Sequence, residues 1–284
     1  KKFRFKRPQW HIYLLLAPMV LLSILPIMYI VFTAFKPIGE LFAYPPKFFT
    51  LRPTMDNFRK LFEASEDTIF PLSMYLFNSI VSTAAVVLIG MIIAVMAAYA
   101  LSKKRFRGRN TIFKMNTLSM MFVATAVSIP RYLIIKEVGL IDSFWANIIP
   151  MLAMPVGVFL LKQFVDQLPD AVIEAARIDG ATEMRVFIEM VLPALKPSTA
   201  TLTVFSFVNN WNDYFSPLIY VTSQAMKTLP LALQTIGGGA AGMSVGRAGA
   251  VAAATFIMTA PTIIIFVWKQ GQVMETMTHS GIKG

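Results

Sequence analysis

Long apolar runs alternate with short polar segments along the whole chain. Six of the runs are long enough to cross a bilayer, which takes about 20 mostly apolar residues in a helix. They cover residues 10–35, 72–101, 112–135, 143–164, 197–221 and 248–269. The third and fifth are the least regular, because Lys114 and Arg131 interrupt the third and Asp213 interrupts the fifth. The pattern predicts an all-α integral membrane protein in which residues 1–284 form a single domain with six transmembrane helices.

The composition agrees with a membrane protein and excludes a soluble globular domain. Of the 284 residues, 56% are hydrophobic and only 14% are charged, whereas an average soluble domain carries about 25% charged residues. The chain has 26 Lys and Arg against 15 Asp and Glu, a net charge of +11. These positive charges lie between the apolar runs, which indicates membrane topology and not nucleic-acid binding.

The distribution of Lys and Arg predicts the orientation of the chain. Seventeen of them lie in the N-terminal segment, in residues 102–114 and 162–196 and in the C-terminal tail, and nine lie in the other segments. Because Lys and Arg are enriched on the inner side, both termini are expected in the cytoplasm. Five basic residues precede the first run and no A-x-A site follows it, which is typical of a signal anchor and not of a cleaved signal peptide.

Few residues of this chain suit catalysis or metal binding. There is no cysteine and there are only two histidines, so thiolate chemistry and disulfides are excluded, and no plausible zinc or catalytic constellation can be assembled. We therefore expect neither a metal nor a cofactor on this chain.

The most informative polar segment, residues 166–196, separates the fourth and fifth runs. From Gln167 to Pro193 it reads QLPDAVIEAARIDGATEMRVFIEMVLP, which is long for a helix connection and rich in helix formers. Asp170 is expected to cap a first helix, Gly180 to interrupt it, and a second helix to start near Thr182. The segment is therefore predicted to form two short helices beside the membrane on its cytoplasmic face.

Two interpretations of this segment remain open on physical grounds. Amphipathic helices of this kind lie on lipid headgroups in many proteins. The acidic side chains of the segment argue against an anionic lipid surface and favour a protein partner instead.

The residues of this segment also carry a family resemblance. Glu174-Ala175-Ala176, Asp179-Gly180-Ala181 and Leu192-Pro193 resemble the EAA loop of bacterial ABC importer permeases, in which E-A-A is followed after three residues by G and later by I/V-x-L-P. The hydrophobic position of the closing motif is shifted here. The A-R-I-D-G-A-T form is similar to the carbohydrate-uptake branch, the maltose-type permeases.

Further matches extend the resemblance to the smaller, six-span maltose-type permease over nearly the whole chain. They comprise Phe35-Lys36-Pro37 to Phe48, Ile129-Pro130 to Leu140, the W-N-D signature within Asn209–Asp213 followed by Pro217-Leu218, and the ending Ser280–Gly284. The sequence departs from the family at Arg131, where an uncharged residue is usual, and in the glycine tract 237–242.

The resemblance implies a type I ABC importer permease fold in the bacterial cytoplasmic membrane, with a cytoplasmic coupling helix in residues 166–196. This helix would dock on a cytoplasmic ATPase dimer through Glu174, Ala175, Ala176, Asp179, Gly180, Ala181, Leu192 and Pro193. The chain has no G-x-x-x-x-G-K-[ST] motif, so ATP and Mg²⁺ are expected on that partner. Other implied partners are a second homologous permease, an extracytoplasmic solute-binding protein, a sugar and membrane lipid, but no nucleic acid.

Polar residues within the expected spans are candidates for the translocation pathway. Charged groups inside a span face the interior or a water-filled cavity by default, which singles out Asn209, Asn210, Trp211, Asn212, Asp213 and Arg131. Amides and an indole face suit the hydroxyls and C–H groups of a sugar. The alternatives are that the asparagines brace the bend before Pro217 and that Arg131 only reaches toward the membrane interface.

These patterns predict a translocating subunit without enzymatic activity of its own. An ion-coupled secondary transporter is the main alternative, and Asp213 is nearly the only ionisable residue that could serve it. A membrane scaffold that recruits a cytoplasmic partner through residues 169–193 is the other.

Overall fold

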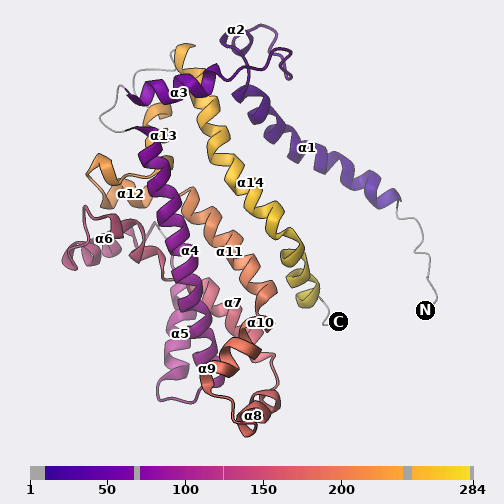
Figure 1. Cartoon of the computed structure of the whole chain (residues 1–284), viewed down its shortest axis with the longest axis vertical. Coiled ribbons are helices and arrows are strands. Elements are labelled where there is room, and N and C mark those ends of the chain that lie inside the picture. Colours follow the sequence, from indigo (N-terminus) through magenta and orange to yellow (C-terminus); the bar gives the residue numbers. More distant parts are fainter. Residues whose placement is uncertain (1–9, 67–70, 124, 239–244, 282–284) are drawn as a thin grey trace. The chain divides into compact units, whose positions relative to one another are not determined.

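The computed structural model describes residues 10–66, 71–123, 125–238 and 245–281, in which every regular element is a helix (Figure 1). The chain divides into two compact units. One comprises residues 1–69 with 235–259, and the other comprises residues 70–234 with 260–284. The basic residues 1–7 and most of the glycine tract 237–242 lie outside the described residues.

The first unit contains α1 (Trp10–Ala34), α2 (Ile38–Leu41), α3 (Asp56–Glu66) and the first part of α14 (Val245–Gly281). Asn57 of α3 is fully buried, and its amide donates to the carbonyl oxygens of Ala34 and Lys36 at 2.8 and 2.7 Å. These bonds fix the chain where it leaves α1. A Cβ on Gly249 of α14 would lie 2.2 Å from Asn57 Oδ1, so this glycine permits the close approach of α3 and α14.

The second unit is organised around the long helix α4 (Leu72–Lys103). α7 (Pro155–Asp166) and α11 (Lys196–Trp211) lie beside it (Figure 1). Small residues of α4 allow this close packing, and the shared apolar core consists of Ala94, Val95, Ala98, Tyr99, Leu161, Val165, Val191, Leu195 and Leu202.

The other elements of the second unit are short. They are α5 (Arg109–Ser119), α6 (Ser128–Glu137), η1 (Phe144–Asn147), η2 (Ile149–Met151), α8 (Asp170–Ile178), α9 (Glu183–Val186), η3 (Phe187–Val191), α10 (Leu192–Ala194), α12 (Phe215–Tyr220) and η4 (Gln224–Met226). α13 (Leu229–Gly238) and α14 contribute residues to both units.

Four helices among the described residues are long and apolar enough to cross a membrane. They are Tyr13–Ala34, Leu72–Lys103, Phe144–Asp166 and Ala248–Met274, and they coincide with four of the six predicted runs. A fifth candidate is the pair Glu183–Ala194 and Lys196–Trp211, whose axes are bent by 74°.

The prediction of one continuous helix over residues 112–135 is wrong. α5 ends at Ser119 and α6 starts at Ser128. Pro130 is the third residue of α6, where the missing amide hydrogen is tolerated because first-turn amides have no partner within the helix. A helix arriving from α5 would place this proline in its interior.

The fifth run, residues 197–221, is also divided. α11 ends at Trp211 and α12 starts at Phe215, so Pro217 again occupies the third position of a new helix. Proline alone does not cause such a break, since Pro18 and Pro26 lie inside the continuous helix α1. Hydropathy located this run, but it did not predict that the run is two helices.

Candidate functional site

The segment after α7 forms the short helix α8, which carries Glu174-Ala175-Ala176. Pro169 precedes the helix with extended backbone and Asp170 is the first helical residue. The predicted capping by Asp170 is therefore wrong, although its carboxylate lies in the first turn, where it interacts favourably with the helix dipole. Glu174 and Ala175 are exposed, Ala176 is half-buried and Ile173 is buried, so Glu174 and Ala175 are accessible at the surface.

α8 ends in a Schellman motif at Gly180, where the predicted glycine break lies. The amide of Ala181 donates to the carbonyl of Ala176 at 2.9 Å, and the amide of Gly180 donates to the carbonyl of Arg177 at 3.0 Å. Gly180 has a φ of +84°, a left-handed conformation that costs other residues free energy and glycine almost none. The direction in which the chain leaves α8 is thus fixed by this glycine.

The chain then turns into α9 and returns to the bundle. Thr182 caps α9, because its hydroxyl accepts the amide of Arg185 at 3.3 Å. The following η3 is a π-helical turn, and Pro193 is the second residue of α10. Val186 and Val191 are buried, whereas Leu192 is exposed. The second predicted helix is therefore present, but it consists of three consecutive helical pieces.

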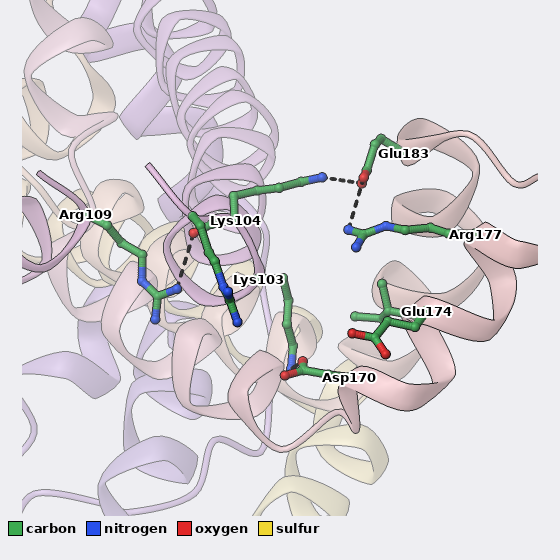
Figure 2. A pocket seen from close by; sticks show the side chains of 9 residues that line it. Lys103, Lys104, Arg109, Asp170, Glu174, Arg177 and Glu183 are labelled. Carbon is green, nitrogen blue, oxygen red and sulfur yellow. Dashed lines mark hydrogen bonds and ion pairs between the residues drawn. The ribbon is translucent and has the colours of Figure 1, made fainter. Parts of the chain in front are cut away.

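Two consecutive lysines at the end of α4 hold this segment, which is well separated from them in sequence. Lys103 donates from Nζ to the carbonyl of Leu168 and to the carboxylate of Asp170, both at 2.6 Å. Lys104 forms an ion pair with Glu183 (Figure 2). One lysine thus contacts the start of α8 and the other contacts the start of α9.

Glu183 has several partners at once. Its carboxylate accepts the Tyr99 hydroxyl at 3.0 Å and pairs with Arg177 at 3.0 Å in addition to Lys104. The hydrogen bond from Lys104 is the main cause that lowers the pKa of the Glu183 carboxyl. The hydrogen bond from Lys103 likewise lowers the pKa of Asp170. Both carboxylates are therefore charged at neutral pH and remain so in mild acid.

These side chains surround a polar cavity of about 720 Å³ between the end of α4 and α8 (Figure 2). Its lining residues are Lys103, Lys104, Arg105, Arg109, Asp170, Ile173, Glu174, Arg177 and Glu183. Five of them are basic and three are acidic, so the cavity has a small positive excess.

Large apolar side chains are exposed on the same segment. Ile178, at the end of α8, is 86% exposed. Val172, Met184, Ile188 and Leu192 are also largely exposed. Exposed apolar residues in a polar segment are typical of a surface that contacts another protein or a membrane.

Asp213, predicted to line a pathway, caps a helix. Its Oδ1 accepts the amides of Phe215 and Ser216 at 3.0 and 3.1 Å, which satisfies the free amides at the start of α12. Asp213 also interacts electrostatically with the Tyr220 hydroxyl, as does Arg131. The structure therefore brings Asp213 and Arg131 close to one residue, Tyr220, that the sequence did not single out.

The other polar candidates of α11 do not form one cluster. The amides of Asn210 and Asn212 donate to the carbonyl oxygens of Ser206 and Val208, one turn earlier, both at 2.8 Å. The first bond lies within α11 and the second joins its C-terminal end to the residue after it, so neither bridges α11 to an adjacent helix. Asn209 is exposed and, with Asn210, lines a cavity of about 210 Å³ that also contacts the start of α7.

Trp211 is buried and stacks on Phe207, with ring centroids 5.7 Å apart. Both rings line an apolar cavity of about 730 Å³ between α4, α11 and the C-terminal part of α14. Trp211 therefore belongs to a different cavity from Asn209.

Sequence reasoning missed Tyr99, Lys103, Lys104 and Tyr220 as parts of these sites. The two lysines were counted only as topology signals, and nothing in the sequence pattern links them to the distant residues 170–183. Among the residues whose placement is described, no group of three or more His, Asp or Glu side chains could hold a metal ion.

The amino-acid sequence matches a known family over most of its length. Residues 90–272 match the family described as "Binding-protein-dependent transport system inner membrane component". The chain is 33% identical to Protein LplC of Bacillus subtilis over 220 residues. This alignment covers 76% of this chain and 70% of that protein. It is 28% identical to the "Arabinooligosaccharides transport system permease protein AraQ" of Halalkalibacterium halodurans, over 93% of this chain and 92% of that protein.

A solved structure has the same arrangement of helices. A chain of a bacterial ABC transporter involved in the import of the acidic polysaccharide alginate superposes with a TM-score of 0.74 at 23% identity, covering 94% of this chain and 99% of that chain. At this level of identity the likeness concerns the fold.

Proposed function

The chain belongs to the binding-protein-dependent transport system inner membrane component family, and from that premise we propose that it is the translocating subunit of an ATP-driven sugar importer. Its fold is that of an ABC importer permease. The import would depend on an extracytoplasmic solute-binding protein that delivers the substrate. A related alginate transporter has been crystallised in complex with an alginate pentasaccharide-bound periplasmic protein.

The proposed substrate is a sugar or an oligosaccharide. The names of its relatives support this class: besides AraQ, they include the "Diacetylchitobiose uptake system permease protein DasC" of Streptomyces coelicolor, which is 28% identical over 92% of both chains. The relatives differ in the sugar that they are named for, so the proposal extends to the class and not to one sugar.

The observation that carries the proposed coupling is the geometry of α8. Glu174 and Ala175 are exposed, and Ala176 is half-buried. The glycine turn at Gly180 ends the helix, and the ion pair of Asp170 with Lys103 holds its start. Small side chains allow close docking, and Glu174 offers a charge-assisted hydrogen bond, typically about 1.5–3 kcal/mol. The surface that docks on the ATPase would also include Ala181, Leu192 and Pro193, with Asp179 at the turn. ATP and Mg²⁺ would be held by that partner.

The proposed transport cycle is alternating access. Closure of the ATPase dimer would move α8 and rock the helices of this chain against those of a second, homologous permease. In the membrane, both termini would face the cytoplasm and lipid would cover the exposed apolar faces. Six crossings require that the divided runs 112–135 and 197–221 each cross as a broken helix.

The residues proposed for the translocation pathway line separate cavities, whereas the sequence indicated a single polar cluster. Asn209 and Asn210 would face one cavity and Trp211 another, while Asn212 bonds back to Val208 of α11. Arg131 and Asp213 would act near Tyr220, toward the outer side of the membrane.

The proposed function is tested by charge reversal on α8. Glu174→Lys should leave the protein inserted in the membrane but prevent co-purification of an active ATPase and abolish ATP-dependent uptake in proteoliposomes. The assay would use labelled arabino-oligosaccharide and diacetylchitobiose with the purified binding protein. Glu63→Lys is the matched control, since Glu63 is an exposed carboxylate of α3 that pairs with Arg59 in its own helix.

Two results would contradict the proposal. Uptake that persists without any ATPase and collapses with the ion gradient would identify a secondary transporter. A partner lost in Glu174→Lys, with no solute flux in the wild type, would identify a membrane scaffold.

A further inference from the structure

α8 is joined to the rest of the molecule mainly through polar side chains. Ile173 is its one buried residue, and its most extensive backbone contact with another element is with α9. By contrast, the continuation through η3 and α11 packs Val191, Leu195 and Leu202 into the core beside α4 and α7. The position of α8 relative to α4 therefore depends on its charged contacts.

Those contacts converge on Glu183. It lies on α9, pairs with Arg177 of α8, and contacts both Tyr99 of α4 and Lys104, the residue that follows α4. The Tyr99 ring is itself fixed, because it packs against Phe187 with ring centroids 5.5 Å apart. One carboxylate thus ties α8 and α9 to a rigid point at the end of α4.

The second connection between α8 and α4, the ion pair of Asp170 with Lys103, has one buried and one exposed partner. Lys103 is nearly buried, with 8% of its side chain exposed, whereas its partner Asp170 is 76% exposed. This pair holds only the start of α8. Without Glu183, the far end of α8 would keep only the contact of Arg177 with the neutral Tyr99 hydroxyl, and no ion pair would remain there to oppose its movement.

We propose that Glu183 is a positioning residue for transport, because it makes α8, α9 and the end of α4 move as one body. This inference rests on the proposed function, in which α8 receives the movement of the ATPase. Glu183 does not need to touch the ATPase in this role. Exposed ion pairs add little to global stability, so its removal should disconnect the movement of α8 from α4 and leave the fold intact.

The first test compares Glu183→Gln with Glu63→Gln in the reconstituted complex with its ATPase and binding protein. Glu63 is a matched control, since its side chain is 51% exposed and that of Glu183 is 53% exposed. Glu183→Gln should retain ATPase binding and ATP hydrolysis, but uptake per ATP hydrolysed should fall at least about fivefold, the lower end of typical coupling between linked sites. Glu63→Gln should match the wild type.

A second variant restores the connection by a different chemistry. The chain has no cysteine, so Lys104→Cys with Glu183→Cys introduces the only two thiols of this chain. The unbridged double variant should be uncoupled, and a short bis-methanethiosulfonate reagent that joins the two thiols should restore uptake per ATP. Reduction of the bridge should lower uptake per ATP again.

Several results would overturn the inference. One is that Glu183→Gln imports as much sugar per ATP hydrolysed as the wild type. Another is that bridging the two thiols does not restore uptake per ATP. A third is that Glu183→Gln no longer binds the ATPase, because Glu183 would then be a docking residue. Each of these leaves the proposed function standing if the wild type imports sugar with ATP. Absence of ATP-dependent uptake in the wild type, for every sugar that the purified binding protein binds, would overturn both proposals.

Discussion

At the scale of single residues, the ends of the helices are decided by a few special side chains. Pro217 occupies the third position of α12, and the carboxylate of Asp213 accepts two amides at the start of that helix. Pro261 lies inside α14, which continues through it. Pro217 is therefore found in the first turn of a new helix that starts at Phe215, where the carboxylate of Asp213 accepts the first two amides.

Two substitutions at Asp213 distinguish a capping role of this residue from a role in transport. Asp213→Ala removes the acceptor and should cost about 1 kcal/mol of stability, as is typical for loss of a helix cap. Asp213→Asn keeps an oxygen acceptor and should retain most of that stability, measured by thermal unfolding in detergent. If the charge also serves the pathway, Asp213→Asn should reduce uptake without changing the unfolding temperature. Equal uptake in Asp213→Asn and the wild type would leave capping as its only role.

Gly180 is the residue of the segment 166–196 whose backbone conformation most restricts substitution. Nothing lies within 4 Å of a Cβ added there, but its φ is +84°. Gly180→Ala should therefore destabilise the end of α8 by about 1–2 kcal/mol, the cost of a left-handed conformation. Hydrogen exchange at Ala181 should be faster by a corresponding factor. Gly39→Ala is the control, since it has equal space without a positive φ, and unchanged exchange in Gly180→Ala would contradict the assignment.

At the scale of elements, α8 and α9 are attached by carboxylates whose pKa values are lowered, and this fixes the pH dependence of the attachment. A carboxyl with a lowered pKa in the folded state contributes stability that is present above its ordinary pKa, about 4.3 for Glu. That contribution is lost as the pH falls through the lowered folded value. The attachment is thus expected to be constant from neutral pH down to about pH 5.5.

The unfolding temperature of the wild type minus that of Glu183→Gln measures this contribution. The difference should stay constant between about pH 8 and 5.5 and shrink below about pH 4, because Gln does not titrate and Glu183 becomes protonated only there. A difference that disappeared between pH 7 and 6 would show that Glu183 lacks the lowered pKa caused by Lys104.

The elements differ in how far the sequence predicted them. Uninterrupted apolar runs located α1, α4, α14 and the span ending in α7, because twenty apolar residues have few alternatives to a helix in lipid. Helix formers around Gly180 predicted the two short helices. The contacts of Lys103 with Asp170 and of Lys104 with Glu183 were not predictable, because they join segments far apart in the sequence whose proximity depends on how α4 and α7 pack.

At the scale of the whole molecule, the basic residues at the end of α4 have two uses. Arg107 is exposed and counts only toward the excess of positive charge that predicts the cytoplasmic side. Lys103 and Lys104 count toward the same excess, yet they also hold the segment that would receive the ATPase. Topology and coupling therefore depend on the same stretch of sequence, and an inverted topology would remove both.

Single cysteines at three positions of this cysteine-free chain test whether residues 112–135 cross the membrane, as six crossings require. Arg52, Arg107 and Glu137 are exposed positions before α4, after α4 and at the end of α6. With six crossings, a membrane-impermeant maleimide should label Arg52→Cys and Glu137→Cys in right-side-out vesicles and Arg107→Cys only in inside-out vesicles. Because α5 and α6 are separate helices, Glu137 is the decisive position: labelling from the inner side would mean that residues 112–135 fold back without crossing. Each variant must retain ATP-dependent uptake, so that the topology measured is that of the working protein.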